Sequence, residues 1–167
     1  MESESDTFMT RTLRAAYCGL LFSGLLLAQS VTIGGDIPQP VTLTKETLAK
    51  MPRTSASWSE HGPAVNYEGV SLYEILKVAG APLDKQLSGK ALAAYVLAEA
   101  KDGYQVVFTL PEVDPAYTDD KILLADTANG QPLDDTHGPF RIVVAHDKKG
   151  ARSIRMLEKI TVVRLRK

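Results

Sequence analysis

The residues best suited to chemistry lie in one segment near the C-terminus, residues 137–155, which reads HGPFRIVVAHDKKGARSIR. This segment contains two of the chain's three histidines and five of its lysines and arginines. Gly150 permits a turn with outward-facing backbone amides, and the residues after it can open a helical turn whose free N–H groups favour an anion. Arg152 and Arg155 would flank that turn, and arginine can bind phosphate through two hydrogen bonds at once. The pattern indicates a pocket for a phosphate-like or carboxylate group.

A second interpretation of the same segment stays open. Lys148, Lys149 and Gly150 can form an ordinary surface turn, with the nearby arginines paired to acidic groups elsewhere.

Residues 141–167 carry 9 Lys and Arg against 2 Asp and Glu, whereas residues 30–140 carry 8 against 15. Because the positive charge is local, a small anionic ligand is the expected partner, and nucleic acid is not.

The elements that would position these residues form an α+β pattern. Strands are expected at 40–44, 91–100, 104–110, 121–126, 140–146 and 159–165, and the Lys-Asp-Gly turn between the second and third predicts a hairpin. Short helices are expected at 45–51 and from Ser71, where Ser71 and Glu74 form a capping box. Strands and helices do not alternate, which favours a mainly antiparallel or mixed sheet.

The N-terminus has the features of a signal peptide over residues 1–30. Arg11 and Arg14 precede an apolar run, 15–28, that is short for a bilayer span. Its removal would leave one domain, 31–167, without a stable membrane span and without Cys18, the only cysteine. No adjacent arginine pair is present, so the general secretion route and a periplasmic or secreted location are expected. An uncleaved anchor or a buried helix is the alternative.

No familiar catalytic or metal-binding motif is found, so the catalytic residues stay unknown. His61, His137 and His146 fall in three separate loops, and nothing in their spacing fixes a metal geometry. Asp114, Asp119 and Asp120 lack the spacing of a calcium loop. We therefore predict no metal ligated by side chains, and we expect a solvated acidic loop around residue 114.

The order of several short motifs adds a family resemblance. YEGVSLYEILKVAGAP, KDGYQVVFTLPEVD, ILLADTANGQPL, HGPFRIVV and GARSIRMLEKITVV occur in this order between about residues 41 and 163. The ordered set resembles the oxidoreductase molybdopterin-binding domain of the sulfite oxidase superfamily. The resemblance implies the mixed α+β fold of that family, with molybdopterin as the cofactor.

The resemblance also implies which residues would hold the cofactor. The segment from residue 149 to residue 155 matches the loop that holds the pterin and its phosphate, and Trp58 and His61 lie where the family's cofactor-facing loop is expected. His146, at the exit of the expected strand 140–146, would line the same pocket. The cofactor-binding set is His61, His146, Lys149, Gly150, Ala151, Arg152, Ser153 and Arg155.

Two departures from the family pattern bear on catalysis. The family's metal-ligating cysteine is expected between residues 53 and 66, where this chain has Ser55, Ser57 and Ser59 and no cysteine. A serine hydroxyl is a harder and far less acidic ligand than a thiol. Met156 also stands where the family usually has tryptophan.

Two functional hypotheses follow from the sequence. The first is an exported molybdopterin-dependent oxidoreductase. The second is a non-catalytic module of the cell envelope with the same fold, which binds another anion or an envelope protein partner. The missing cysteine and the type of signal favour the second.

Overall fold

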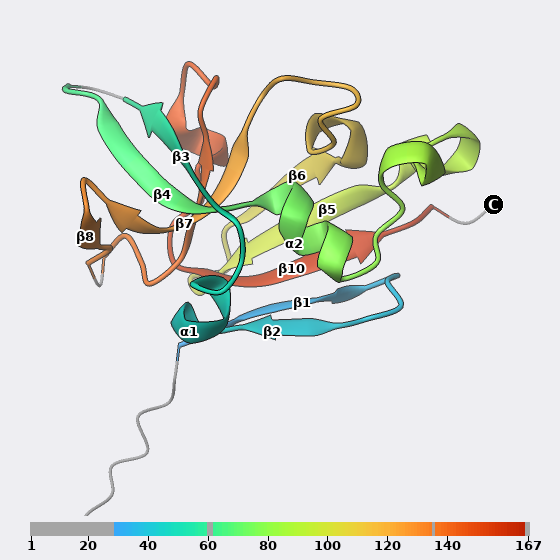
Figure 1. Cartoon of the computed structure of the whole chain (residues 1–167), viewed down its shortest axis with the longest axis horizontal. Helices are drawn as coiled ribbons and strands as arrows, with labels where there is room; N and C mark the ends of the chain where they lie inside the picture. The colour runs from blue at the N-terminus through green and yellow to red at the C-terminus, as the bar shows by residue number, and fades with distance from the viewer. Residues whose placement is uncertain (1–28, 60–61, 135, 166–167) are drawn as a thin grey trace, which may run out of the picture.

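A computed structural model describes residues 29–59, 62–134 and 136–165, which form ten strands, two α-helices and four 3-10 turns (Figure 1). The strands are β1 (Val31–Gly35), β2 (Val41–Leu43), β3 (Arg53–Trp58), β4 (Val65–Ser71), β5 (Tyr95–Ala100), β6 (Gln105–Thr109), β7 (Ile122–Ala128), β8 (Gln131–Pro132), β9 (Arg141–Val144) and β10 (Leu157–Val163). The helices are α1 (Lys45–Leu48) and α2 (Leu72–Val78), and the 3-10 turns are η1 (Asp84–Gln86), η2 (Gly89–Ala93), η3 (Leu110–Glu112) and η4 (Gly150–Arg152).

The strands form two five-stranded sheets. Sheet A has the order β2-β1-β10-β5-β6, and only its β1–β10 pair is parallel. Sheet B has the order β3-β4-β7-β8, with β9 also paired to β7, and all of its pairs are antiparallel. This mixed, mainly β architecture with short helices confirms the predicted α+β class.

The main hydrophobic core lies between the two sheets and includes the apolar side of α2. Leu72, Ile75 and Leu76 of that helix are buried there with residues from the inner faces of both sheets. A smaller cluster covers the other face of sheet B and contains Trp58, Tyr67 and neighbouring apolar residues. Sheet B is therefore buried on both faces, which explains the fully apolar run at the start of β7.

Several local expectations are confirmed. β5 and β6 form the predicted hairpin, and Gly103 in its turn has φ of +85°, a conformation that glycine adopts without a steric penalty. Ser71 caps α2, because its hydroxyl accepts a hydrogen bond from the backbone N–H of Glu74 at 3.2 Å, but the Glu74 side chain does not complete the predicted capping box. Thr44 caps α1 in the same way through the N–H of Thr47.

Other expectations were wrong. The strands expected from the sequence correspond to β2, β5, β6, β7, β9 and β10, whereas β1, β3, β4 and β8 were not predicted. Asp114 is not solvated: it is fully buried, and its carboxylate accepts the backbone N–H groups of Asp84 and Ala116 at 2.6 and 2.9 Å. Asp114 therefore stabilises the turn that follows η3.

The predicted signal peptide, with Cys18, lies outside the described residues except for positions 29 and 30. Among the described residues, no helix is long and apolar enough to cross a membrane. The proposed domain boundary at residue 31 coincides with the first residue of β1, and it stays a prediction.

Candidate functional site: a basic cleft beside sheet B

A cleft of about 770 Å³ opens where the outer face of sheet B meets the β5–β6 turn. Its lining residues come from four places: β3 and β4, the β5–β6 turn, the start of β9, and the segment that follows β9. They are Trp58, Ser59, Pro63, Val65, Tyr67, Ala100, Asp102, Tyr104, Thr136, His137, Arg141, Lys148, Lys149, Gly150, Ala151, Ser153, Ile154, Arg155 and Met156. The volume lies in the range of small-molecule sites.

The charge lining the cleft is mostly positive. Arg141, Lys148, Lys149 and Arg155 contribute four cationic side chains, and Asp102 is the one acidic residue among the described lining residues. Such an arrangement attracts anions, because the field of clustered charges is focused where protein walls exclude water.

A buried arginine lies at the cleft, with its guanidinium close to two aromatic rings. Arg141 is 5% exposed, and its guanidinium carbon lies 4.7 Å from the centre of the Tyr67 ring and 5.9 Å from that of Trp58. Its Nη1 donates to the Tyr67 hydroxyl at 3.0 Å, and its Nη2 lies 3.4 Å from the carbonyl oxygen of Ser153. The guanidinium is thus fixed in a position from which it contributes charge to the cleft.

The segment from Asp147 to Arg155, called here the basic loop, forms one wall. It contains the single turn η4 and is tied to the body by several side chains. Tyr104 donates its hydroxyl to the carbonyl of Ala151 at 2.9 Å, and the backbone N–H of Val144 donates to the Ser153 hydroxyl at 3.1 Å. The sequence-based prediction of a helical turn here is confirmed, with η4 being a 3-10 turn.

Five of the eight predicted cofactor-binding residues line the cleft, namely Lys149, Gly150, Ala151, Ser153 and Arg155. Lys149 and Arg155 are exposed, whereas Ser153 is buried. The structure therefore brings together the lysine, the glycine turn and one of the two arginines that were predicted from their spacing and from the family resemblance.

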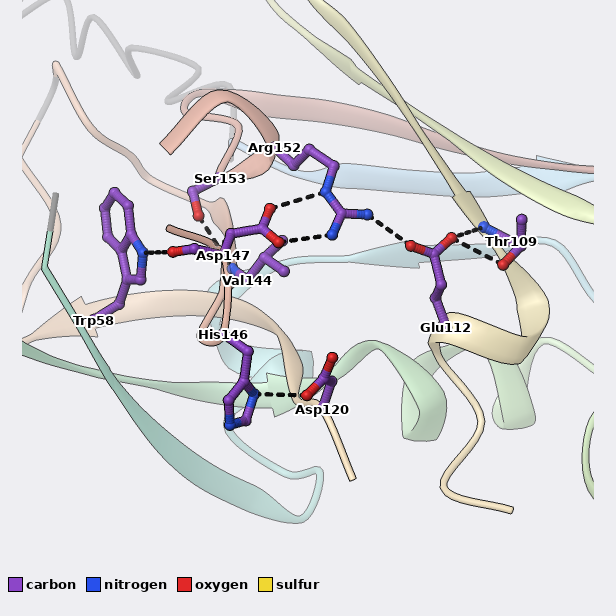
Figure 2. Close-up of polar contacts among 9 residues, drawn as sticks. All are labelled: Trp58, Thr109, Glu112, Asp120, Val144, His146, Asp147, Arg152 and Ser153. Carbon is purple, nitrogen blue, oxygen red and sulfur yellow. Dashed lines mark hydrogen bonds and ion pairs between the residues drawn. The ribbon is translucent and has the colours of Figure 1, made fainter. Parts of the chain in front are cut away.

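The other three predicted residues are not among the described lining residues. Arg152 forms ion pairs with Asp147 and Glu112, each with an N–O distance of 2.7 Å (Figure 2). The His146 side chain is 62% exposed, and its Nδ1 lies 3.0 Å from a carboxylate oxygen of Asp120. His61 lies outside the described residues.

Sequence reasoning missed several lining residues. His137 lines the cleft, and its Nδ1 lies 2.7 Å from Oδ1 of Asp134. Asp134 holds the His137 imidazole in one orientation, and hydrogen bonds from Thr136 and His137 lower the pKa of Asp134 far below its ordinary value. The Gly-Pro pair after His137 was the available signal, but it indicated a turn and not a site.

The serines near the expected cysteine position do not all face the cleft. Along β3, Ala56 and Trp58 are buried against the outer face of sheet B, whereas Ser55 and Ser57 are exposed on the opposite side of the strand. Ser59 does line the cleft, and its hydroxyl donates to the carbonyl of Gly62 at 2.6 Å.

The fold and the cleft together define a class: a domain of one mixed and one antiparallel β-sheet whose cleft is lined by cationic and aromatic side chains. Residues 55–167 match the family model described as the oxidoreductase molybdopterin binding domain. The chain belongs to this family. The resemblance inferred from the ordered motifs is therefore confirmed.

Comparison with solved structures supports the fold. The crystal structure of the sulfane dehydrogenase SoxCD from Paracoccus pantotrophus superposes with a TM-score of 0.61 at 22% sequence identity. The match covers 80% of this chain and 37% of that protein, so this chain spans little more than a third of its length. No curated protein matches the chain.

Proposed function

We propose that this chain is an exported molybdopterin-binding protein that holds the phosphate and the pterin of the cofactor in the basic cleft. The observation that carries the proposal is the cleft itself, where Arg141, Lys149 and Arg155 meet aromatic side chains in a volume suited to a small molecule. Family membership supports molybdopterin as the ligand, because the match includes every described residue of the cleft.

The two ends of molybdopterin differ in how well the cleft suits them. The phosphate suits the lysines and Arg155, since cationic side chains form short, strong hydrogen bonds with phosphate oxygens. The flat pterin suits the exposed ring of Tyr104, which lines the cleft. This part of the cofactor therefore fits the residues present.

The metal end lacks the expected protein ligand. Residues 55–167 contain no cysteine, and the serines of β3 face away from the cleft. A bound molybdenum cofactor supplies two-electron redox chemistry, but the residues of this chain provide no thiolate for its metal. We therefore assign this chain the roles of binding and orienting the ligand and derive no redox step.

Export is proposed from the basic start and the short apolar run of residues 15–28. On this proposal the protein works in the periplasm or outside the cell, where the cleft is open to small anions of that compartment.

The direct test is the composition of the purified protein. The full chain is produced with its own leader in a host that makes molybdopterin, and bound pterin is measured by fluorescence after oxidation, together with elemental molybdenum. The expected result is about one pterin per chain, lost in a Lys149→Gln, Arg155→Gln double variant. Lys159→Gln, a charge change on the outer face of sheet A, is the matched control and retains the pterin.

A second candidate is favoured by a specific observation: the absence of cysteine from residues 55–167, together with the predicted general secretion route, which carries chains unfolded. Under this alternative the cleft binds another anion without catalysis. Two results together would establish the alternative and overturn the molybdopterin proposal. The protein from a competent host would contain no pterin, and phosphate or sulfate would raise its melting temperature in wild type but not in the double variant.

A further inference from the structure

Arg152 makes contacts that differ from those of the other cations near the cleft. Its Nε and Nη2 donate to the two carboxylate oxygens of Asp147 at 2.8 and 2.7 Å, and its Nη1 donates to Oε1 of Glu112 at 2.7 Å (Figure 2). The guanidinium carbon also lies 5.5 Å from the centre of the Phe108 ring. This group therefore connects the basic loop with the end of β6.

Both acidic partners of Arg152 are themselves held. The Oε2 atom of Glu112 accepts the backbone N–H and the hydroxyl of Thr109, both at 2.8 Å, so η3 fixes that carboxylate. The backbone carbonyl of Asp147 accepts the indole N–H of Trp58 at 3.0 Å, which ties the same loop residue to β3. A continuous set of hydrogen bonds thus runs from β6 through Arg152 and Asp147 to β3.

The charges in this set are mutually stabilised. Hydrogen bonding to Asp147, and then to Glu112, raises the pKa of Arg152. Burial alone would raise the pKa of Glu112, but hydrogen bonds from Thr109 and Arg152 hold it below its ordinary value. The side chains are 38% and 41% exposed, so the pair alone adds little to global stability. The bidentate contact of Arg152 with Asp147 gives orientation more than energy.

The position of Arg152 in η4 explains which residues face the ligand. Arg152 lies on the side of the turn that meets Asp147 and Glu112, whereas Lys149, Gly150 and Arg155 line the cleft. A short turn cannot present all of its side chains to one side. Fixing Arg152 outside therefore presents the remaining cations inside.

We propose that Arg152 is a positioning residue for the basic loop and not a ligand-binding cation. It orders the loop before the ligand arrives, so that the binding energy of Lys149 and Arg155 is not spent on ordering the loop. The inference rests on the proposed function of the cleft as an anion site, but its structural part is measurable in the ligand-free protein.

The chain offers a spectroscopic reporter of this role. Trp58 is its only tryptophan, and its indole N–H is bonded to the basic loop at Asp147. Release of the loop exposes the indole to water, which shifts its emission to longer wavelength and increases quenching by acrylamide. Amide exchange over residues 147–155 reports the same event independently.

The decisive variant is Glu112→Gln, because two explanations predict opposite signs for it. Removal of a negative charge beside the basic loop would tighten anion binding if Arg152 acted as a ligand-binding cation. A positioning role predicts weaker binding, since the loop loses one of its fixed partners. The measurement is the affinity of the full chain for inorganic phosphate by titration calorimetry, at several ionic strengths.

The expected outcomes are specific. Arg152→Gln weakens phosphate binding about tenfold, shifts the Trp58 emission and accelerates exchange in the loop, and Arg152→Lys restores part of each effect. Glu112→Gln weakens phosphate binding about twofold to fivefold in spite of its added positive charge. Lys159→Gln changes none of these quantities.

Two results would overturn the role of Arg152: tighter phosphate binding by Glu112→Gln, or unchanged Trp58 emission and loop exchange in Arg152→Gln. Failure of the cleft as an anion site looks different, because wild type would then bind neither pterin nor phosphate. The emission and the exchange of the ligand-free variants still decide the structural role in that case. Glu112→Gln keeps the test available should Arg152→Gln fold poorly.

Discussion

The bidentate ion pair between Arg53 and Asp126 fixes the start of β3 to β7 across the intervening strand β4. Nη1 of Arg53 donates to Oδ2 at 3.1 Å and Nη2 donates to Oδ1 at 2.7 Å. The Asp126 side chain is 10% exposed and that of Arg53 is 34% exposed. The other end of β3 carries Trp58 to the cleft. Because Asp126→Asn removes one charge of a partly buried ion pair, we predict that it destabilises the fold by about 2 kcal/mol.

This magnitude follows from the degree of burial. Breaking a fully buried pair costs about 3–5 kcal/mol, because one charge stays buried without its partner. An exposed pair contributes about 0–1 kcal/mol. Here one partner is nearly buried and the other is one-third exposed, so an intermediate value applies. Asparagine retains one acceptor oxygen for Arg53, so we expect about 2 kcal/mol, which is less than the cost of breaking a fully buried pair.

The pair also predicts a pH dependence. Burial alone would raise the pKa of Asp126, but hydrogen bonds from Arg53 and Thr127 hold it below its ordinary value. A carboxyl with a lowered folded-state pKa adds stability above the pKa of the unfolded chain, about 3.9, and loses it as the pH falls through the folded value. The difference between wild type and Asp126→Asn is therefore largest near neutral pH and shrinks in acid.

The assay is urea unfolding followed by circular dichroism, at pH 7 and at several acidic values. A double-mutant cycle with Arg53→Gln gives the coupling energy, expected at about 1–2 kcal/mol. Lys159→Gln, which removes a more exposed pair with Glu99, is the control and changes stability by less than about 0.5 kcal/mol. A coupling below about 0.5 kcal/mol, or a difference that does not change with pH, would refute the reasoning.

Three further substitutions test other contacts. Gly69→Ala places a Cβ in steric conflict with a carbonyl oxygen of β7, so we expect a loss of stability of more than about 2 kcal/mol by calorimetry. Gly34→Ala, whose Cβ would have no atom within 4 Å, is the control and should not cost as much. Equal losses of stability would contradict the packing argument. Ser153→Ala leaves the buried N–H of Val144 without its 3.1 Å acceptor and should cost about 1–3 kcal/mol in urea unfolding, and a neutral effect would argue against that bond. Tyr104→Phe removes a 2.9 Å hydrogen bond to the basic loop, so amide exchange over that loop should accelerate. Global stability should change by less than about 0.5 kcal/mol. Unchanged amide exchange would show that Tyr104 does not hold the loop.

The features predicted well from the sequence are those that depend on local chemistry. The β5–β6 hairpin follows from Asp102 and Gly103, and the start of α2 follows from Ser71, because turns and caps are determined by residues within a few positions. The turn at Gly150 was predictable for the same reason, and it positions five of the predicted site residues along the cleft.

The features that were missed depend on distant partners. β3 reads as a polar segment because only Ala56 and Trp58 are buried, and its polar residues are explained only by its place at the edge of sheet B. The spacing of Arg152 and Arg155 suggested that both bind the ligand. Arg152 instead pairs with Asp147 and Glu112, as the alternative interpretation of this segment predicted for nearby arginines. Glu112 lies 40 residues before Arg152, so no local pattern identifies it as the partner.

The place of β10 in sheet A has a consequence for the order in which the molecule can assemble. β10 lies between β1 and β5, so the ribbon of β1 and β2 and the hairpin of β5 and β6 are joined only through it among the described strands. Two-stranded units are marginal on their own in water. Synthesis from the N-terminus delivers residues 157–163 after the other described strands. Their pairing with residues 31–35 joins positions that are far apart in the chain, and such contacts form slowly. Sheet A therefore completes only after residues 157–163 have emerged, and until then its two halves remain separate two-stranded units.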